Sequence, residues 1–202
     1  MADGNININV ESNMEMKLSI LICGLASRMQ SYTSLTAELY EQFKDKPYAV
    51  EMLTEVDNGE MSIGEKRNKL LDRSKGEYVC FIDDDDVIFK NYIDHLFVGI
   101  NKGVDCCSLR GVITWDGDRP QLFEHSIKYD AYRTNDTGAI KYERYPNHLN
   151  CIKSSIAKQF KFPETNHGED TDWATQIFKS GLIKTEHFID DTIYHYQYKP
   201  TK

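Results

Sequence analysis

The stretch YVCFIDDDDVIF, residues 78–89, places an apolar segment of strand length directly before four consecutive carboxylates. Tyr78 to Ile82 have the uniformly apolar character of a strand that is buried on both faces of a parallel sheet. Asp83 to Asp86 follow without a spacer. Adjacent carboxylates repel one another, and burying them without partners is costly. This junction therefore predicts a site where the carboxylates are neutralised or hydrogen-bonded.

The segments on either side of this strand alternate between strand and helix patterns. An S-x-x-E capping box, Ser62 to Glu65, predicts a helix start near Ile63. Strand patterns lie at 17–25, 48–56 and 78–82, and helical spacing of apolar residues lies at 27–43, 63–75 and 89–100. The resulting β-α-β-α-β-α order predicts an α/β fold with a mostly parallel sheet flanked by helices.

The second half of the chain has a different pattern. The segments VDCCSLRGVITW (104–115), LFEHSIKY (122–129) and AIKYERY (139–145) are typical of strands, and turn signals separate them. We expect antiparallel or edge strands here, then a last helix over about 170–180 and a short C-terminal strand. No linker or repeat divides the chain. We therefore predict a flexible or loosely attached tail over 1–15 and a single domain over 16–202, with halves at about 16–103 and 104–202.

Composition narrows the classes of partner and compartment. The net charge of −8 argues against nucleic-acid or anionic-membrane partners, although a nucleic acid acceptor is not excluded by charge alone. No apolar run approaches the ~20 residues of a membrane span, and the polar N-terminus lacks the pattern of a signal peptide. The five cysteines form no C-x-x-C pair, which favours buried free thiols in a reducing, cytoplasmic compartment.

Two interpretations of the four aspartates follow from the residues themselves. At the carboxyl end of a parallel strand they occupy the ligand-binding edge of an α/β sheet, where a divalent cation such as Mg²⁺ or Mn²⁺ offsets their repulsion. Alternation along an extended chain would then place Asp83 and Asp85 on one side. Alternatively, an aspartate caps the following helix, which accounts for one or two carboxylates but not for four.

A strand ending in D-x-D-D, after a first strand of the LSILI type, resembles the GT-A fold glycosyltransferases, in particular those of family 2. The resemblance implies a metal-dependent, inverting transferase that moves a sugar from a nucleoside diphosphate sugar, with UDP favoured, to an acceptor hydroxyl. It implies Asp85 as a ligand of Mn²⁺ or Mg²⁺ and Asp83 as a ligand or ribose contact. Four aspartates leave the register open by one, so Asp84 is also a donor candidate, and Asp86 caps the helix or joins the metal through water.

Three further segments match the nucleotide-binding part of that family. GLASR (24–28) lies at the expected diphosphate and base loop, EVDNG (55–59) contains the acid that receives uracil, and EKRNKLL (65–71) resembles its basic helix. If the resemblance is set aside, Arg28, Lys66 and Arg67 are interpreted as solvated charges on helix surfaces. The donor-binding residues that the resemblance implies are Leu25, Ala26, Arg28, Asp57, Lys66 and Arg67.

A second acidic cluster lies in NHGEDTDWATQIF, residues 166–178. Acids at a helix start are favoured by the helix dipole, so the pattern alone means little. The resemblance implies that Asp170 is the general base, because a sugar hydroxyl is a poor nucleophile and needs a carboxylate to accept its proton. Glu169 is the runner-up. The candidate acceptor residues are Trp115, His167, Asp172 and Trp173, of which Trp173 is alternatively a core residue.

The aromatic segment YHYQY (194–198) contains His195, which the resemblance implies as a further metal ligand. An aromatic strand with one inward histidine accounts for the segment equally well. The acceptor is expected to be a glycan or another hydroxyl compound. Two rival functions share this architecture: a sugar nucleotidyltransferase, and a non-catalytic GT-A-like domain that binds sugar or nucleotide.

Overall fold

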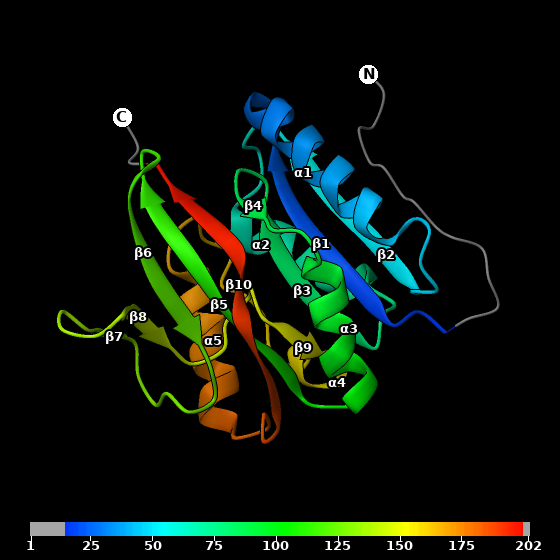
Figure 1. The fold of residues 1–202 in the computed structure, drawn as a ribbon. Helices are drawn as coiled ribbons and strands as arrows, with labels where there is room; N and C mark the ends of the chain where they lie inside the picture. Colours follow the sequence, from blue (N-terminus) through cyan, green and yellow to red (C-terminus); the bar gives the residue numbers. More distant parts are fainter. Residues whose placement is uncertain (1–14, 200–202) are drawn as a thin grey trace.

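The computed structural model describes residues 15–199 and forms one sheet covered by helices on both faces (Figure 1). The strands follow the spatial order β2-β1-β3-β9-β5-β6-β8-β7, and β10 pairs with β5 and β4. The strands are β1 (Leu18–Leu25), β2 (Val50–Asp57), β3 (Tyr78–Asp83), β4 (Val87–Ile88), β5 (Cys106–Trp115), β6 (Asp118–His125), β7 (Arg133–Thr134), β8 (Ile140–Arg144), β9 (Cys151–Lys153) and β10 (Glu186–Tyr198). The helices are η1 (Ala26–Arg28), α1 (Met29–Phe43), α2 (Ile63–Arg73), α3 (Tyr92–Lys102), α4 (Ser154–Ala157) and α5 (Glu169–Ser180). The expected α/β architecture is confirmed.

The first three strands bring their carboxyl ends to one edge of the sheet. β1 pairs in parallel with both β2 and β3, and Leu25 lies opposite Asp57 while Cys23 lies opposite Asp83. The helix α2 begins at Ile63 behind the Ser62–Glu65 capping box, as the sequence predicts. This arrangement places the loop after each strand on the same side of the domain.

Side-chain alternation along β1 fills two separate cores. Ile20 belongs to the cluster under α1 and α3, whereas Leu21 belongs to the cluster under α2, α4 and α5. In Figure 1, α1 and α3 lie in front of the sheet, and α2 and α5 lie behind it. Because helices cover both faces, every position of the strand is apolar or shielded. Trp173 is 1% exposed in the second core and stacks on Phe162, so its interpretation as a core residue is correct.

The second half extends the sheet with mixed pairing. β5 and β6 form the expected antiparallel hairpin, while β10 runs parallel to β5 over its whole length, with register shifts between Ile189 and Tyr194. The strand predicted over 122–129 ends at His125, because Ser126 begins a turn that Tyr129 closes. The second half of β10 lies beside the aspartates at the end of β3. There Tyr194 Oη accepts a hydrogen bond from Asp83 N and donates one to Asp86 Oδ2.

The structure corrects the helix predicted to start at Phe89. Residues 87–88 form the short strand β4, Asn91 adopts a left-handed conformation (φ 66°), and α3 begins only at Tyr92. The four aspartates instead make a turn closed by a hydrogen bond from Asp86 N to Asp83 O (3.1 Å). The interpretation of an aspartate as the cap of the following helix is therefore wrong.

Two expectations from composition concern the state of the cysteines and the presence of a membrane span. All five cysteines are free and buried, as expected. Within residues 15–199, no helix combines the length and the apolarity that crossing a bilayer requires. The tail predicted over 1–15 lies almost wholly outside the described residues.

Candidate active site

The four aspartates have different partners, and this separates them into two pairs. Asp84 accepts hydrogen bonds from Leu25 N (2.8 Å) and Arg28 Nη1 (3.0 Å). Asp86 accepts hydrogen bonds from Tyr194 Oη (2.7 Å) and from the Gln197 backbone N (2.8 Å). Both side chains are buried and satisfied by the protein.

Asp83 and Asp85 form the other pair. Their side chains are 23% and 15% exposed, against 3% for Asp84, and both line a cavity of about 420 Å³. Arg28 Nη1 lies 3.2 Å from Asp85 Oδ1 and is the cation that faces this carboxylate. Burial, followed by the negative charges of Asp84 and Asp83, raises the pKa of Asp85 above its ordinary value despite Arg28. The turn thus leaves one incompletely neutralised carboxylate beside the cavity.

The donor set at this turn fits a hard divalent cation only in part. Carboxylate oxygens are suitable ligands for Mg²⁺ or Mn²⁺. Among residues 15–199, however, no group of three or more histidine, cysteine or acidic side chains is arranged to hold an ion. Asp85 and Asp83 would therefore supply two ligands, and the rest of the coordination shell would come from water and substrate phosphates, as is common for Mg²⁺.

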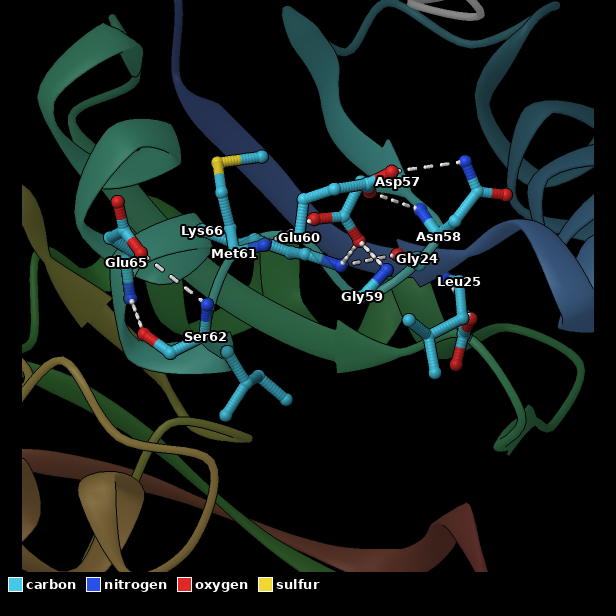
Figure 2. Close-up of polar contacts among 12 residues, drawn as sticks. Gly24, Leu25, Asp57, Asn58, Gly59, Glu60, Met61, Ser62, Glu65 and Lys66 are labelled. Atoms are coloured by element: carbon cyan, nitrogen blue, oxygen red, sulfur yellow. Dashed lines mark hydrogen bonds and ion pairs between the residues drawn. The ribbon is translucent and has the colours of Figure 1, made fainter.

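The loop after β2 is fixed around Asp57 (Figure 2). Asp57 accepts hydrogen bonds from Gly59 N (3.0 Å) and Met61 N (2.8 Å) and forms an ion pair with Lys66. Lys66 Nζ also donates to Gly24 O (2.8 Å). Burial opposes ionisation of Asp57, but the bonds from Lys66, Met61 and Gly59 lower its pKa.

Lys66 thus joins the loops that follow β1 and β2. The side chain is buried, and its ammonium group is engaged with Asp57 and Gly24. Gly59, Met61 and Lys66 line the 420 Å³ cavity, whereas the carboxylate of Asp57 supports the loop from behind. In the observed conformation, a nucleobase in this cavity would therefore touch the loop and not the carboxylate of Asp57, for which the sequence predicts a direct contact.

Arg67 connects the two acidic clusters. Its Nη2 lies 3.0 Å from Asp83 Oδ1, and its Nε lies 3.3 Å from Glu169 Oε1. The guanidinium is buried against the rings of Phe81 and Phe162. Although burial opposes ionisation, Arg67 holds the pKa of Asp83 well below its usual range. Arg67 is therefore an internal counter-ion whose Nη1 has no hydrogen-bond partner among the described residues.

The Glu-Asp pair at the start of α5 divides into a buried and an accessible carboxylate. Gly168 adopts a left-handed conformation (φ 78°) immediately before the helix, where a side chain would be strained. Glu169 is buried against Arg67, while the side chain of Asp170 is 30% exposed. Asp170 is therefore the one of the two acids that a bound molecule can reach.

Two cavities adjoin at Asp83. The 420 Å³ cavity contains Arg28 and Asp85. A neighbouring cleft of about 510 Å³ contains Asp170 and Glu169. Residues that line both are Ile63, Asp83, Asn166, His167, Tyr196 and Tyr198. Arg28 and Asp85 thus lie in one space, Asp170 lies in the other, and the two spaces share these six lining residues.

The sequence model described as glycosyl transferase family 2 matches residues 30–162, which include the aspartate turn and the basic helix α2. The chain belongs to this family. The expected family is therefore confirmed. A comparison with curated protein sequences gave no match.

Solved structures with this fold include those of S. aureus TarS. TarS 1–349 in complex with UDP-GlcNAc has a TM-score of 0.66 at 16% identity, over 93% of this chain and 60% of that chain. The complex of the same fragment with UDP has a TM-score of 0.64 at 17% identity, over 92% and 61%. The longer TarS structure has a TM-score of 0.62 at 18% identity, over 91% and 37%. This chain thus spans about 60% of the length of the TarS fragments, and the likeness shows the fold.

Several residues predicted for the family 2 site lie away from these two cavities. His195 Nε2 lies 2.8 Å from Thr114 Oγ1, and His195 is not among the residues that line either space. On β10, Tyr196 and Tyr198 line both cavities instead, in alternate positions of the strand. The structure thus does not bring His195 to Asp85, and its predicted role as a metal ligand lacks geometric support. Asp172 is exposed on α5 outside the cleft.

Sequence reasoning missed His148, which lies between the two acidic clusters. Its Nε2 is 3.6 Å from Asp83 Oδ2, and its Nδ1 is 3.5 Å from Asp170 Oδ2. The side chain is 5% exposed. A turn holds it, because Asn147 N donates to Asn150 Oδ1 (2.9 Å) and Leu149 N donates to Asn147 Oδ1 (3.1 Å). The signal in the sequence is N-H-L-N before a strand, since asparagines on both sides of a histidine indicate a side-chain-stabilised turn.

The buried imidazole of His125 makes the free energy of unfolding depend on pH in the acidic range. Burial, followed by the electrostatic influence of the neighbouring His148, lowers the pKa of His125 to about 3. The folded state therefore holds this imidazole neutral, and stability is complete above the unfolded pKa of about 6.5 and falls as the pH drops below it. We expect His125→Gln to reduce the acid dependence of the unfolding free energy by up to about 1.4 kcal/mol per pH unit between about pH 6 and 4.

Urea unfolding of both proteins at several pH values measures this slope. Equal slopes for the wild type and His125→Gln would contradict the assignment of a neutral buried imidazole. The exposed His167→Gln variant is the matched control, because its side chain lies at the open surface of the cleft.

Proposed function

We propose that this chain is a metal-dependent, inverting glycosyltransferase that moves a sugar from a nucleoside diphosphate sugar, preferably a UDP-sugar, to an acceptor hydroxyl. The observation that carries the proposal is the pair of adjoining cavities. One contains the partly exposed Asp85 beside Arg28, the other contains the accessible Asp170, and Asp83 lines both. A transferase needs both a donor space and an acceptor space that meet at the transferred group.

Asp170 is the general base in this proposal. It accepts the proton of the acceptor hydroxyl as that oxygen forms a bond to the anomeric carbon. The bond between the anomeric carbon and the diphosphate oxygen breaks, and the nucleoside diphosphate leaves with the bonding electrons. Attack from the cleft, opposite the departing diphosphate in the 420 Å³ cavity, inverts the anomeric centre.

The donor side must stabilise the negative charge of the departing diphosphate. Asp85 and Asp83 would hold Mn²⁺ or Mg²⁺, which supplies that charge stabilisation when bound. Arg28 lines the donor cavity, with its side chain 46% exposed beside Asp85. Arg67 and Lys66 instead keep the acidic side chains and the loops in place, since both are buried in internal ion pairs. The preference for UDP is supported by S. aureus TarS, which was crystallised with UDP and UDP-GlcNAc.

A thermal-shift screen with UDP-, GDP- and dTDP-sugars, each with and without Mn²⁺, tests the donor and the ion together. A ligand at about 100 times its Kd stabilises the fold by about 2.7 kcal/mol. For a domain of this size, that corresponds to a rise in Tm of about 5 to 10 °C. We expect this rise with a UDP-sugar and Mn²⁺ together, and much smaller rises when either is left out.

Release of UDP from the same UDP-sugar then separates the proposal from its rivals. An active transferase releases UDP slowly to water in the presence of the ion, whereas a non-catalytic binding domain shows the thermal shift alone. A sugar nucleotidyltransferase would form UDP-sugar from UTP and a sugar phosphate. Equal stabilisation with and without Mn²⁺ would contradict the metal dependence.

A further inference from the structure

The cleft that contains Asp170 has an aromatic wall, which we call the aromatic platform: Trp115, Tyr142 and Tyr198. Trp115 ends β5, Tyr142 lies on β8, and Tyr198 ends β10. The Trp115 ring centroid lies 5.9 Å from that of Tyr142 and 6.3 Å from that of Tyr198. Three strands far apart in the sequence thus place three rings side by side.

The platform is open to solvent although its rings are large and apolar. Tyr198 is 41% exposed, and Trp115 and Tyr142 are only half-buried. The other tryptophan of the chain, Trp173, is 1% exposed in the core. Large aromatic side chains that stay open in a cleft next to polar groups indicate a ligand-binding surface. The polar groups here are the side chains of Arg144 and Asn147, which line the same cleft.

We propose that the acceptor is a sugar chain, and that a sugar ring of this chain stacks on the aromatic platform while its hydroxyl reaches Asp170. This inference rests on the proposed transferase function. A pyranose ring has apolar C–H faces and hydroxyls around its edge. A group of neighbouring aromatic rings with polar groups at its border matches both parts, since the ring faces supply apolar contact area and the border supplies hydrogen bonds.

Charge and strand pairing disfavour the other acceptor classes. Asp170 is the accessible acid of the cleft, and the chain carries a net charge of −8, so a nucleic acid backbone is disfavoured. An extended peptide commonly binds by adding a strand to an open sheet edge. At Trp115 that mode is closed, because β5 is already paired with β10 on one side and with β6 on the other.

The first test uses tryptophan fluorescence, because Trp115 is the accessible one of two tryptophans. The full chain, with UDP and Mn²⁺ present, is titrated with maltose, cellobiose and chitobiose. The same titration is made with a serine- and threonine-containing peptide and with a single-stranded oligodeoxynucleotide. We expect a saturable change in fluorescence with at least one disaccharide. We expect this fluorescence change to disappear in Trp115→Phe, because that variant lacks the accessible indole that reports binding. A change with the peptide or the oligonucleotide alone, or with none of the probes, would overturn the proposal.

The second test separates the platform from the transfer chemistry. We expect Trp115→Ala to raise the KM for the saccharide acceptor about tenfold or more. Trp115→Phe, which keeps an aromatic ring, should restore most of the affinity. Tyr40→Ala is the matched control, because it removes an exposed aromatic ring from α1, outside the cleft.

The outcomes distinguish the two levels of the argument. Absence of hydrolysis in the wild type would count against the proposed transferase function. Hydrolysis by the wild type together with an unchanged acceptor KM in Trp115→Ala would count against the aromatic platform alone.

Discussion

Asp170→Asn is expected to lower the rate of sugar transfer about 1000-fold while the affinity for the nucleotide donor stays unchanged. A general base contributes roughly 10²- to 10⁴-fold, and an amide cannot accept the proton of the attacking hydroxyl. The substitution is close to isosteric. Asp170 is 30% exposed and makes one weak side-chain hydrogen bond, from Thr171 Oγ1 (3.4 Å), so the fold should tolerate the change.

Steady-state transfer rates and donor titration calorimetry measure the two quantities separately. Asp172→Asn is the matched control, because it removes an acid from the same first turn of α5 without touching the cleft. Transfer at the wild-type rate by Asp170→Asn would show that another group takes the proton. Glu169 is a weak alternative, since Arg67 holds it in a buried ion pair.

The strand order of the first half follows from local sequence patterns. Alternating apolar strands and amphipathic helices, with a capping box before α2, specify a parallel sheet because each segment needs both partners to bury its surface. The carboxyl edge of that sheet then brings Leu25, Asp57 and Asp83 together without further information. For this reason the proximity of these residues could be predicted from the sequence, whereas their role in nucleotide binding comes from the family resemblance and stays a prediction.

The register of the aspartates could not be predicted, because it depends on partners distant in sequence. Asp84 is held by Arg28 and Asp86 by Tyr194, across 56 and 108 positions of the chain. The prediction for His195 failed to gain support for a related reason. Its side-chain direction is set by the register shifts of β10 against β5, which leave no local signal. The position of His148 likewise depends on a turn that packs against β3.

Asp85→Ala is expected to abolish the metal-dependent part of donor binding. Charge stabilisation by a divalent ion is worth several kcal/mol, so we expect donor affinity in Mn²⁺ to fall at least about 100-fold. Asp84 and Asp86 cannot replace the lost ligand in the observed conformation, because backbone and side-chain donors already occupy their oxygens.

Without ligand, Asp85→Ala should not lower the Tm, whereas a substitution that damages the fold would. The pKa of Asp85 is raised mainly by burial and also by the neighbouring charges of Asp84 and Asp83, so its ionised form at neutral pH opposes folding. Removing it relieves that repulsion but releases Arg28 from one contact. We therefore expect the Tm without ligand to stay equal or rise, while the increase produced by UDP-sugar and Mn²⁺ disappears.

Thermal melts of the wild type, Asp85→Ala and Asp45→Ala, each with and without UDP-sugar and Mn²⁺, measure both effects. Asp45→Ala removes an exposed carboxylate beyond the end of α1 and should keep the full increase. A metal-dependent increase that survives in Asp85→Ala would mean that Asp85 does not hold the ion. The carboxylate of Asp85 would then serve only as a partner of Arg28, and the diphosphate would have to be neutralised by protein cations instead.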